Sequence, residues 1–339
     1  SRLNYDVFIL STLEGDNESG FISSEYGISP FNYRIKYIAT CGCRNILYRL
    51  LTVLLTYIQL FSHLIKEVKE DDVILVYHSY RYIIPLKLYR FFSKKKILLE
   101  LEEIYSVTWQ QKNKKNFEEN FVRNVPNAYI LINDVISKRC NLSKPGIVCY
   151  GNYSFSNTTF NGISRPIHIV YGGLIKESGD AFLALDLAFY LNSNYQIHIA
   201  GYGDVESINL LLSKIKCINN NLGYDAVIYE GNLSKDVYYQ FLKKCSLGLC
   251  IKSEELSKDA DYYYPSKILI YLGNGVLPIC NKLNSVLSSD FSTNILFVDS
   301  CSLTEVAEKI KTINWNVYSN LSFSKYDLNF CNQLKNLLI

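Results

Sequence analysis

Residues 167–173 read IHIVYGG, residues 196–203 read QIHIAGYG, and residues 226–232 read AVIYEGN. Each is a short apolar run rich in β-branched residues, and each is followed by glycine residues typical of a turn. Apolar runs of this kind are typical of strands whose two faces are both covered by helices. The three stretches therefore predict parallel strands that end in glycine turns.

The same alternation of short apolar runs with longer helical patterns extends over the whole chain. Further strands are predicted at residues 5–10, 34–39, 73–77, 96–101, 128–132, 147–150, 247–251, 276–280 and 295–298. Helices are predicted at residues 45–66, 85–92, 117–123, 180–191, 205–218, 235–244, 266–272 and 303–313. This order predicts an α/β fold of two tandem, doubly wound, Rossmann-like parallel-sheet domains. A cleft between them would face the carboxyl ends of both sheets, where such folds bind ligands.

Length and composition agree with two globular domains. The chain has 339 residues, of which 48% are hydrophobic and 20% charged, and this excludes a disordered or fibrous protein. Residues 151–166, GNYSFSNTTFNGISRP, are rich in Asn, Ser and Gly and predict a linker. We therefore expect an N-terminal domain over residues 1–155 and a second domain over residues 165–313.

Cysteine and histidine usage argues against a zinc site. The ten cysteines include no CxxC pair, and the chain has only four histidines. Isolated cysteines in a chain of this size predict reduced thiols and a cytoplasmic location. The first apolar run, Val7–Leu10, is too short for a secretory signal. The uncharged stretch Leu50–Ile65 is too short for a membrane span and predicts either a core helix or a helix that lies on a membrane.

Positive charge is concentrated in the first half of the chain. Residues 1–160 carry net +5 and residues 161–339 net −2, which together give the +3 of the whole chain. The excess lies mainly in Arg81–Lys96, where six basic residues are interspersed with aromatic and aliphatic ones. This stretch predicts either contact with anionic lipid or a solvated helix end. We expect no nucleic-acid partner.

The most specific local pattern is YYYPSKILIYLGNG, residues 262–275. Pro265 breaks the preceding loop, Ser266 can cap a helix, and Lys267 falls in the first helical turn, where the helix dipole disfavours a cation. A bound anion would reverse that penalty, so the segment predicts a diphosphate cradle, with an incidental lysine as the alternative. The chain has neither GxGxxG nor GxxxxGK[ST], so no standard dinucleotide site or ATPase phosphate loop is indicated.

Four stretches resemble, in order and spacing, the donor domain of retaining GT-B glycosyltransferases. They are VYGGLIKESGDAFLALDLA (170–188), IHIAGYGD (197–204), VIYEGNLSKDVYYQFLKKCSLGLCI (227–251) and YYYPSKILIYLGNGVLPI (262–279). The similarity is to the large family-four group (glycosyl transferases group 1), which builds bacterial surface polysaccharides, and it covers about residues 165–312. The first domain is similar only in its pattern and in DDVILVYHS (71–79) and KKKILLELEEIYS (94–106).

The resemblance implies a nucleotide-sugar donor in the second domain and an acceptor in the first. It also implies that a C-terminal helix within residues 314–339 returns to the N-terminal domain. His78 matches a histidine that faces the transferred sugar. The implied donor-binding residues are Gly20, Gly172, Gly173, Ser178, Gly201, Tyr202, Gly203, Glu230, Gly231, Tyr264, Pro265, Ser266 and Tyr271. Within this set, residues 201–203 with Glu230 and Gly231 match the nucleoside pocket, and residues 172–179 and 264–267 match phosphate contacts.

The chain departs from the family pattern at four positions. Gly173 stands where the family has arginine, and Ser178 where it has lysine, so Lys176 is the nearest replacement. Tyr262 and Ile270 stand in place of two glutamates, of which the second normally holds the ribose hydroxyls. Four acidic residues, Glu254, Glu255, Asp259 and Asp261, lie upstream instead.

The expected reaction is transfer of a sugar, with retention, to a glycan or polyprenyl-linked acceptor. Lys267 and Lys176 would stabilise the departing nucleoside diphosphate. Glu103, together with Glu102 and Tyr105, either orients an acceptor hydroxyl or forms salt bridges with Lys94–Lys96. Asp259-Ala260-Asp261 is interpreted as a polar loop, so neither a metal nor a cofactor is expected, the nucleotide sugar being a substrate.

Such an enzyme would work in the cytoplasm, at the inner face of the membrane. Two alternatives stay open. One is a catalytically silent GT-B protein that binds or scaffolds, which the missing arginine and glutamates favour. The other is a nucleotide-sugar epimerase on the same fold, for which four histidines are few.

Overall fold

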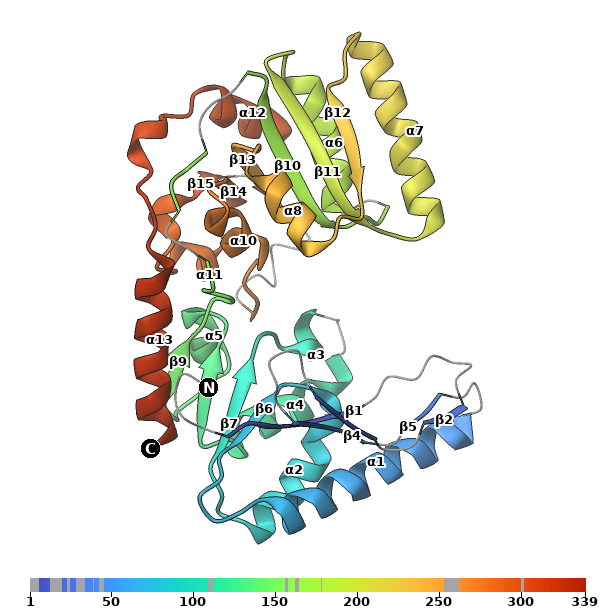
Figure 1. Cartoon of the computed structure of the whole chain (residues 1–339), viewed down its shortest axis with the longest axis vertical. Coiled ribbons are helices and arrows are strands. Elements are labelled where there is room, and N and C mark those ends of the chain that lie inside the picture. Colours follow the sequence, from blue (N-terminus) through green and yellow to red (C-terminus); the bar gives the residue numbers. More distant parts are fainter. Residues whose placement is uncertain are drawn as a thin grey trace. The chain divides into compact units, whose positions relative to one another are not determined.

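The computed structural model describes residues 6–12, 20–22, 25–28, 34–38, 40–42, 46–108, 112–155, 158–161, 165–177, 179–252, 262–299 and 302–339 (Figure 1). Contacts between Cα atoms divide the chain into two compact units. The first consists of Ser1–Ile130, Cys140–Ile147 and Cys331–Ile339, and the second of Leu131–Arg139 and Val148–Phe330.

A six-stranded sheet, parallel throughout, forms the centre of the second unit. Its strands are β10 (Ile167–Leu174), β11 (Tyr195–Tyr202), β12 (Val227–Gly231), β13 (Leu247–Cys250), β14 (Leu277–Asn281) and β15 (Leu296–Val298). Their order in the sheet is β12-β11-β10-β13-β14-β15. Along the chain, β11 and β12 are first added to one side of β10, and β13, β14 and β15 are then added to its other side. The strand order therefore reverses between β10 and β13, the place where doubly wound sheets bind ligands.

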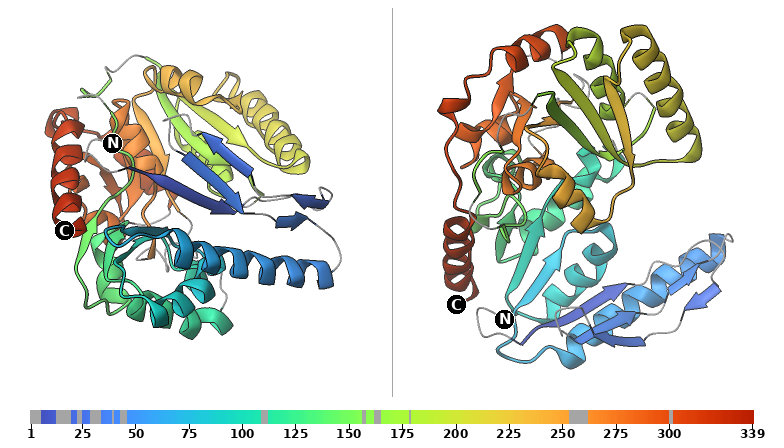
Figure 2. Two further views of the ribbon diagram at one scale, coloured as in Figure 1. Left: turned by 60° about the horizontal axis from the view of Figure 1, so that its bottom comes forward. Right: turned by 45° about the horizontal axis from the view of Figure 1, so that its top comes forward.

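Helices cover both faces of this sheet (Figures 1 and 2). They are α6 (Asp180–Asp186), α7 (Val205–Leu222), α8 (Lys235–Leu242), α10 (Lys267–Gly273), α11 (Asn284–Leu287) and α12 (Leu303–Lys311), with η2 (Leu187–Tyr190), η4 (Ser292–Asn294) and η5 (Trp315–Val317) as short 3₁₀ turns. The last helix, α13 (Phe323–Leu338), begins in this unit, and its residues from Cys331 on belong to the first. Successive side chains of a strand point to opposite faces. Ile169 and Tyr171 accordingly pack with α6, α7 and α12, whereas Val170 packs with α8 and α10.

Aromatic rings fill the core on the α10 face. Phe291 is fully buried, and its ring lies 4.6 Å from that of Tyr326, 5.7 Å from that of Tyr150 and 5.9 Å from that of Phe323. These residues come from well-separated segments of the second unit. The cluster therefore joins the segment after β9 to the end of the chain by apolar contact.

The first unit contains a four-stranded sheet of order β6-β7-β8-β9. Its strands are β6 (Ile74–Tyr77), β7 (Ile97–Leu101), β8 (Ala128–Leu131) and β9 (Gly146–Val148), of which the last two continue into the second unit. The helices between them are α2 (Tyr80–Phe92), α3 (Tyr105–Thr108), η1 (Lys112–Lys114), α4 (Lys115–Asn124) and α5 (Asp134–Arg139), and α1 (Ile46–Glu67) precedes β6.

The expectation of one sheet for the whole first domain is wrong. β1 (Phe8–Thr12), β4 (Arg34–Ile38) and β3 (Glu25–Ile28) form a separate sheet of order β1-β4-β3, and β2 (Gly20–Ile22) pairs with β5 (Thr40–Gly42). β1 and β4, which correspond to two of the predicted strands, pair in parallel. β3 then pairs antiparallel with the other edge of β4, which closes that edge to further parallel strands.

The helix predicted at residues 85–92 begins five residues earlier, at Tyr80. The Ser79 hydroxyl accepts a hydrogen bond from the Arg81 N–H at 3.4 Å, and Pro85 lies inside the helix. Proline removes one backbone donor. Ile83 and Leu86, on the buried side, hold the helix across that position by packing in the core.

The aromatic cluster leads to a stability prediction. Replacing Phe291 by Ala should lower the free energy of unfolding by about 3–5 kcal/mol, because the cavity left among the neighbouring rings cannot collapse fully. The matched change Phe189→Ala, at a ring that is 50% exposed, should cost about 0.5 kcal/mol. Urea unfolding followed by circular dichroism measures both, and equal losses would contradict the cluster's role.

Candidate functional site

The reversal of strand order in the second unit brings together the ends of β10 and β13. β10 ends with Gly172, Gly173 and Leu174, and Lys252 follows β13 by two residues. α10 begins at Lys267. The predicted glycine turn and the predicted lysine therefore belong to one region, at the carboxyl edge of the sheet.

Glycine is required where the ends of β10 and β11 meet. A Cβ atom on Gly201 would lie 1.8 Å from the carbonyl oxygen of Gly173, and one on Gly203 would lie 2.2 Å from that of Ile175. A Cβ atom on Gly172 would lie 2.0 Å from the Tyr238 hydroxyl. These glycines therefore let the two strands stay paired up to their ends.

The Lys267 side chain lies across Gly173. Its Nζ is 3.8 Å from the centre of the Tyr171 ring, a cation–π contact. A Cβ atom on Gly173, whose φ is +148°, would approach Lys267 Cε to 3.0 Å. A larger residue at position 173, such as the arginine of the family that the chain resembles, would thus displace Lys267. Glycine at 173 makes room for a cation supplied from α10.

Lys267 forms no ion pair with a carboxylate among the described residues. Burial lowers the pKa of Lys267 to about 8; the charge of Lys252 acts in the same direction, and Cys250 and Asp180 oppose it. An anion placed next to this ammonium would remove the penalty. The lysine is therefore held in a position that favours a negatively charged ligand.

Asp180 and Lys252 belong to the same region and were missed by the sequence analysis. Lys252 Nζ lies 2.5 Å from Asp180 Oδ2, while Asp180 Oδ1 is buried and has no partner in the described part of the chain. The signal for them was present, because Lys252 directly follows a predicted strand and Asp180 begins a predicted helix. Among the residues that the structure describes, the region thus brings together Lys252, Lys267 and the Asp180 carboxylate.

Two predicted donor-binding tyrosines support the region from within the core. The Tyr271 hydroxyl accepts a hydrogen bond from the Gly172 N–H at 3.0 Å, and its ring packs against Gly248, where a Cβ atom would lie 2.4 Å from it. Tyr264 is buried, and its hydroxyl lies 3.4 Å from Ser289 Oγ. Tyr271 thus holds the end of β10, whereas Tyr264 packs in the core next to α10.

The remaining residues of the predicted diphosphate cradle do not form the helix cap that the sequence predicted. Pro265 is buried, and Ser266 is exposed and makes no side-chain capping bond, so the expected cap is absent. Ile270 and Tyr262 are half-buried. The helix start therefore contributes Lys267 and not a hydroxyl cap.

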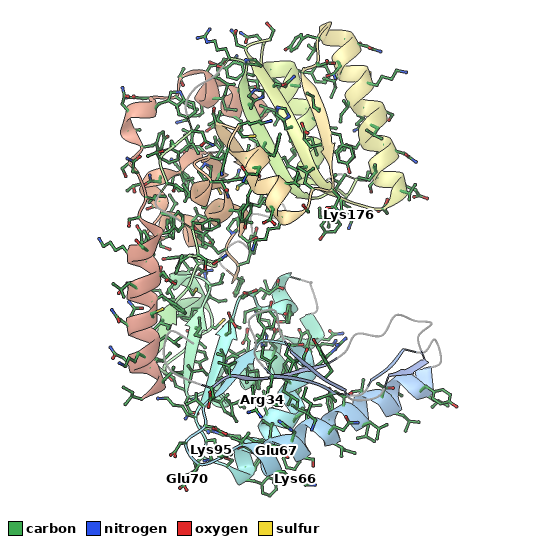
Figure 3. All side chains as sticks on the ribbon, in the orientation of Figure 1. Arg34, Lys66, Glu67, Glu70, Lys95 and Lys176 are labelled. Carbon is green, nitrogen blue, oxygen red and sulfur yellow. The ribbon has the colours of Figure 1, made fainter. Side chains whose placement is uncertain are left out.

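The turn after β10 exposes Lys176 to solvent (Figure 3). Its carbonyl oxygen accepts a hydrogen bond from the Gly179 N–H at 2.9 Å. Tyr202, at the end of β11, is also exposed, and its carbonyl oxygen accepts from the Ile175 N–H. Ser178 and the acidic residues Glu254, Glu255, Asp259 and Asp261 lie outside the described residues.

At the end of β12, Glu230 precedes Gly231, whose φ is +81°. Glu230 Oε1 lies 2.7 Å from His198 Nδ1. The predicted nucleoside residues thus occupy the carboxyl ends of β11 and β12, on one side of the lysines.

In the first unit, His78 is buried and tied to Glu118. His78 Nε2 lies 2.6 Å from Glu118 Oε1, and the ring stacks between Tyr105 and Phe121. Glu118 also accepts hydrogen bonds from the backbone N–H groups of Tyr105 and Ser106 and from the Tyr80 hydroxyl.

These hydrogen bonds decide the charge of Glu118. Burial raises the pKa of Glu118, but the bonds from His78 and Ser106 outweigh burial and leave it lowered. An ionised carboxylate only accepts, so His78 donates from Nε2. In the neutral imidazole Nδ1 is then an acceptor, and it has no partner among the described residues. His78 was predicted from the sequence, whereas its partner Glu118, 40 residues away, was not.

Two further predicted residues lie elsewhere in the first unit. Glu103, just after β7, is half-buried, whereas its neighbour Glu102 accepts a hydrogen bond from the Tyr77 hydroxyl at 2.9 Å. Within the described residues, Glu102 makes no ion pair with Lys94–Lys96. Gly20 lies in β2, opposite Gly42.

Comparisons with known proteins identify the fold. No protein-family model and no curated sequence matches the chain. Solved structures do match, among them Anabaena Alr3699/HepE in complex with UDP and glucose, with a TM-score of 0.63, 10% identity, and 89% of this chain and 86% of that chain covered. The α,α-trehalose 6-phosphate synthase of Burkholderia multivorans matches with a TM-score of 0.60, 8% identity and 92% of each chain covered.

A third match is the UDP-forming α,α-trehalose-phosphate synthase of Burkholderia xenovorans in complex with glucose-6-phosphate. Its TM-score is 0.58 at 9% identity, with 91% of this chain and 86% of that chain covered. These structures are similar to the chain over most of its length. The chain therefore has the GT-B fold that the sequence predicted.

The state of Lys267 can be tested by pH. In the unfolded chain its pKa returns to about 10.5, so between pH 8 and pH 10.5 the unfolded chain binds more protons and the free energy of unfolding rises with pH. Between pH 8 and pH 10.5, the free energy of unfolding of the wild type should rise by about 2–3 kcal/mol relative to that of Lys267→Met. Chemical unfolding at several pH values measures this, with Lys214→Met as the baseline variant. If the difference in the free energy of unfolding between the wild type and Lys267→Met does not change with pH, Lys267 is not held in a desolvated position.

Proposed function

We propose that the chain is a retaining glycosyltransferase that moves a sugar from a nucleoside-diphosphate sugar to a glycan or lipid-linked acceptor. The observation that carries the proposal is the pair of lysines, Lys252 and Lys267, beside glycine-lined strand ends at the reversal of the second sheet. Surface-polysaccharide synthesis in a bacterium is the process that the sequence resemblance favours.

The charge at the reversal suits a diphosphate. Lys267 has no ion-pair partner among the described residues, and Lys252 forms an ion pair with Asp180. A diphosphate placed here would meet two ammonium groups at once. The structures to which the chain is similar include a UDP complex and synthases described as UDP-forming, which supports this ligand class.

The transfer needs stabilisation of the leaving group. As the bond between the sugar's anomeric carbon and the phosphate oxygen breaks, negative charge develops on the nucleoside diphosphate, and fixed cations lower that barrier. The acceptor hydroxyl forms the new bond on the same face, and its proton passes to the departing phosphate. Lys267 is poised for this role because its ammonium is costly to bury until charge appears beside it. No metal or cofactor is part of this proposal.

The first unit would contribute His78, held as an acceptor at Nδ1 by Glu118. A neutral imidazole in this form can accept a hydrogen bond from a sugar hydroxyl. Glu103 remains the second proposed group, for the acceptor.

The experiment that tests donor binding is calorimetry with nucleoside diphosphates. Lys267→Ala should abolish detectable binding of uridine and guanosine diphosphates while the chain stays folded, because the buried cation is lost. The matched control is Lys214→Ala, since Lys214 also lies over an aromatic ring, 4.9 Å from the centre of Phe182, but on α7. Unchanged affinity in Lys267→Ala would refute the diphosphate site.

Turnover separates this proposal from the two alternatives. A silent GT-B protein would bind the nucleotide without consuming its sugar, and an epimerase would change the sugar without transferring it. Release of nucleoside diphosphate from a nucleotide sugar, dependent on added acceptor, is the expected result. Binding with no release from any donor would favour the silent protein.

We further propose that the first unit contacts the inner face of the membrane, where a lipid-linked acceptor lies. No helix in the described residues is long and apolar enough to cross a membrane. α1 packs through Thr56, Leu60 and Leu64 and exposes a broad apolar face on its other side. That face consists of Leu47, Tyr48, Leu50, Leu51, Leu54, Leu55 and Ile58.

The end of α2 adds the most exposed aromatic side chains of this surface. Phe91 is 87% and Phe92 74% exposed. Neither α2 nor the segment from Ile46 to Ile65 contains an acidic residue, whereas α2 carries three basic ones. Figure 3 places Lys66 and Lys95 with Glu67 and Glu70 near the C-terminal end of α1, and these four side chains together carry no net charge, so the basic excess comes from α2. Apolar side chains next to basic ones suit an anionic lipid surface, to which each basic residue contributes about 1 kcal/mol.

Sedimentation with vesicles tests this surface. The chain should bind vesicles rich in phosphatidylglycerol more strongly than neutral ones at low salt, and Phe91→Ser with Phe92→Ser should weaken that binding at least tenfold. Val205→Ser with Val237→Ser, at exposed positions of the second unit, is the control. Equal binding to both vesicle types, or none, would mean that the acceptor is soluble or that another surface docks.

A further inference from the structure

Three polar side chains form a continuous hydrogen-bonded row across three strands of the second unit. His168 Nδ1 on β10 lies 2.8 Å from His198 Nε2 on β11, and His198 Nδ1 lies 2.7 Å from Glu230 Oε1 on β12. Two of the four histidines of the chain thus lie in one row that ends at the carboxyl edge of the sheet. The proposed phosphate contacts do not use it.

Hydrogen-bond chemistry leaves one arrangement of protons along the row. An ionised Glu230 only accepts, so His198 donates from Nδ1 and accepts at Nε2. His168 must then donate from Nδ1. The tautomers of both rings are therefore set by the carboxylate, and the carboxylate is in turn held by the rings.

The surroundings keep both imidazoles neutral at ordinary pH. Burial lowers the pKa of His168 and of His198, and for His168 the charges of His198 and Lys244 add to the effect. For His198, the bond to Glu230 opposes burial without cancelling it. From the α8 side, the Phe241 ring covers His198, with ring centres 5.3 Å apart.

Two further groups face the row. Lys244 acts electrostatically on His168, and the Cys245 thiol, whose pKa burial raises to about 12, lies near Glu230. Cys245 is thus uncharged at ordinary pH, so Glu230 is the one anion that these contacts bring to the row.

Glu230 has one oxygen left for a ligand. Oε1 is held by His198, whereas Oε2 makes no hydrogen bond within the described residues, and the side chain is 25% exposed. Neighbouring strands lie about 4.8 Å apart, so the end of β12 lies about 10 Å from the end of β10. That distance is comparable with the span from the diphosphate of a nucleotide to its base.

We propose that Glu230 reads the base of the donor nucleotide by accepting a hydrogen bond from a ring N–H, and that His198 and His168 are positioning residues for its carboxylate. The inference rests on the proposed function, since it presumes a nucleotide whose diphosphate lies at Lys267. It assigns base recognition to a side chain held by the buried His198 and, through it, by the half-buried His168.

Calorimetry with base-modified nucleotides tests the contact with Glu230. The probes are uridine and guanosine diphosphates and their forms methylated at uracil N3 and guanine N1, which lack the ring N–H. Glu230→Ala should weaken the preferred unmodified nucleotide about 10- to 100-fold, the value of a hydrogen bond to a charged group. The methylated form should bind the wild type as weakly as the unmodified nucleotide binds Glu230→Ala. Its affinity should not fall further in Glu230→Ala, because the hydrogen bond is already missing.

Two substitutions of His198 separate positioning from simple packing. Asn can place an N–H near the position of imidazole Nδ1, whereas Gln can place its amide only near Nε2. His198→Asn should therefore keep affinity within about threefold, and His198→Gln should lose most of what Glu230→Ala loses. Nitrogen chemical shifts should also show His198 protonated at Nδ1 in the wild type and no longer uniformly so in Glu230→Ala.

The outcomes distinguish this inference from the proposed function. If Glu230→Ala and His198→Gln bind the nucleotides like the wild type while Lys267→Ala does not, base reading by Glu230 is refuted and the donor site stands. If they lower only the free energy of unfolding, the row is a structural cross-link. If the wild type binds neither nucleotide, the donor site itself is refuted, and base reading with it.

Discussion

The close approach of β10 and β11 at their carboxyl ends is the constraint on which the second unit depends. The Gly173 carbonyl oxygen occupies a position that would lie 1.8 Å from any Cβ atom on Gly201. Because no side chain stands there, the two strands pair through Gly173 and Gly201 as far as Leu174 and Tyr202. Lys267 can then lie over the strand end and reach the Tyr171 ring. The position of the cation is thus a consequence of backbone packing.

Both units use burial to hold a polar side chain in one chemical form. In the first, Glu118 accepts four hydrogen bonds and orients His78 through one of them. In the second, Lys267 is desolvated against an aromatic ring, with Lys252 paired to Asp180 beside it. The hydrogen bonds to Glu118 already outweigh its burial, whereas the desolvation of Lys267 costs stability until an anion lies beside it.

The sequence predicted the parts of the structure that local patterns encode. The strands of the second sheet and most helices follow from apolar periodicity, and the glycine turns from the short runs that end in them. The first unit was harder, because β2 and β3 are only three and four residues long and leave no periodic signal. The α2 helix was predicted too short because proline was taken as its start, whereas tertiary packing carries the helix through Pro85.

The site was predicted less completely, since spatial neighbours depend on strand order. Lys267 and the glycines stand out in the sequence, but Asp180 becomes a partner of Lys252 only because β10 and β13 are adjacent. His168, His198 and Glu230 likewise lie about 30 residues apart in sequence and meet only through the register of three parallel strands. The chemical types of the site residues could be predicted from the sequence, whereas the side chains with which they form hydrogen bonds and ion pairs could not.

The depressed pKa of Lys267 has a consequence for its chemical reactivity. Lysine reacts with acylating and aldehyde reagents through its uncharged amine, and with a pKa of about 8 roughly a quarter of the Lys267 side chains carry that form at pH 7.5. An ordinary lysine with a pKa near 10.5 is almost entirely protonated under the same conditions. Lys267 is therefore a place where a mild covalent label would attach selectively. Any anion lying beside it would restore its proton and protect it, so the rate of labelling would report occupancy of the site.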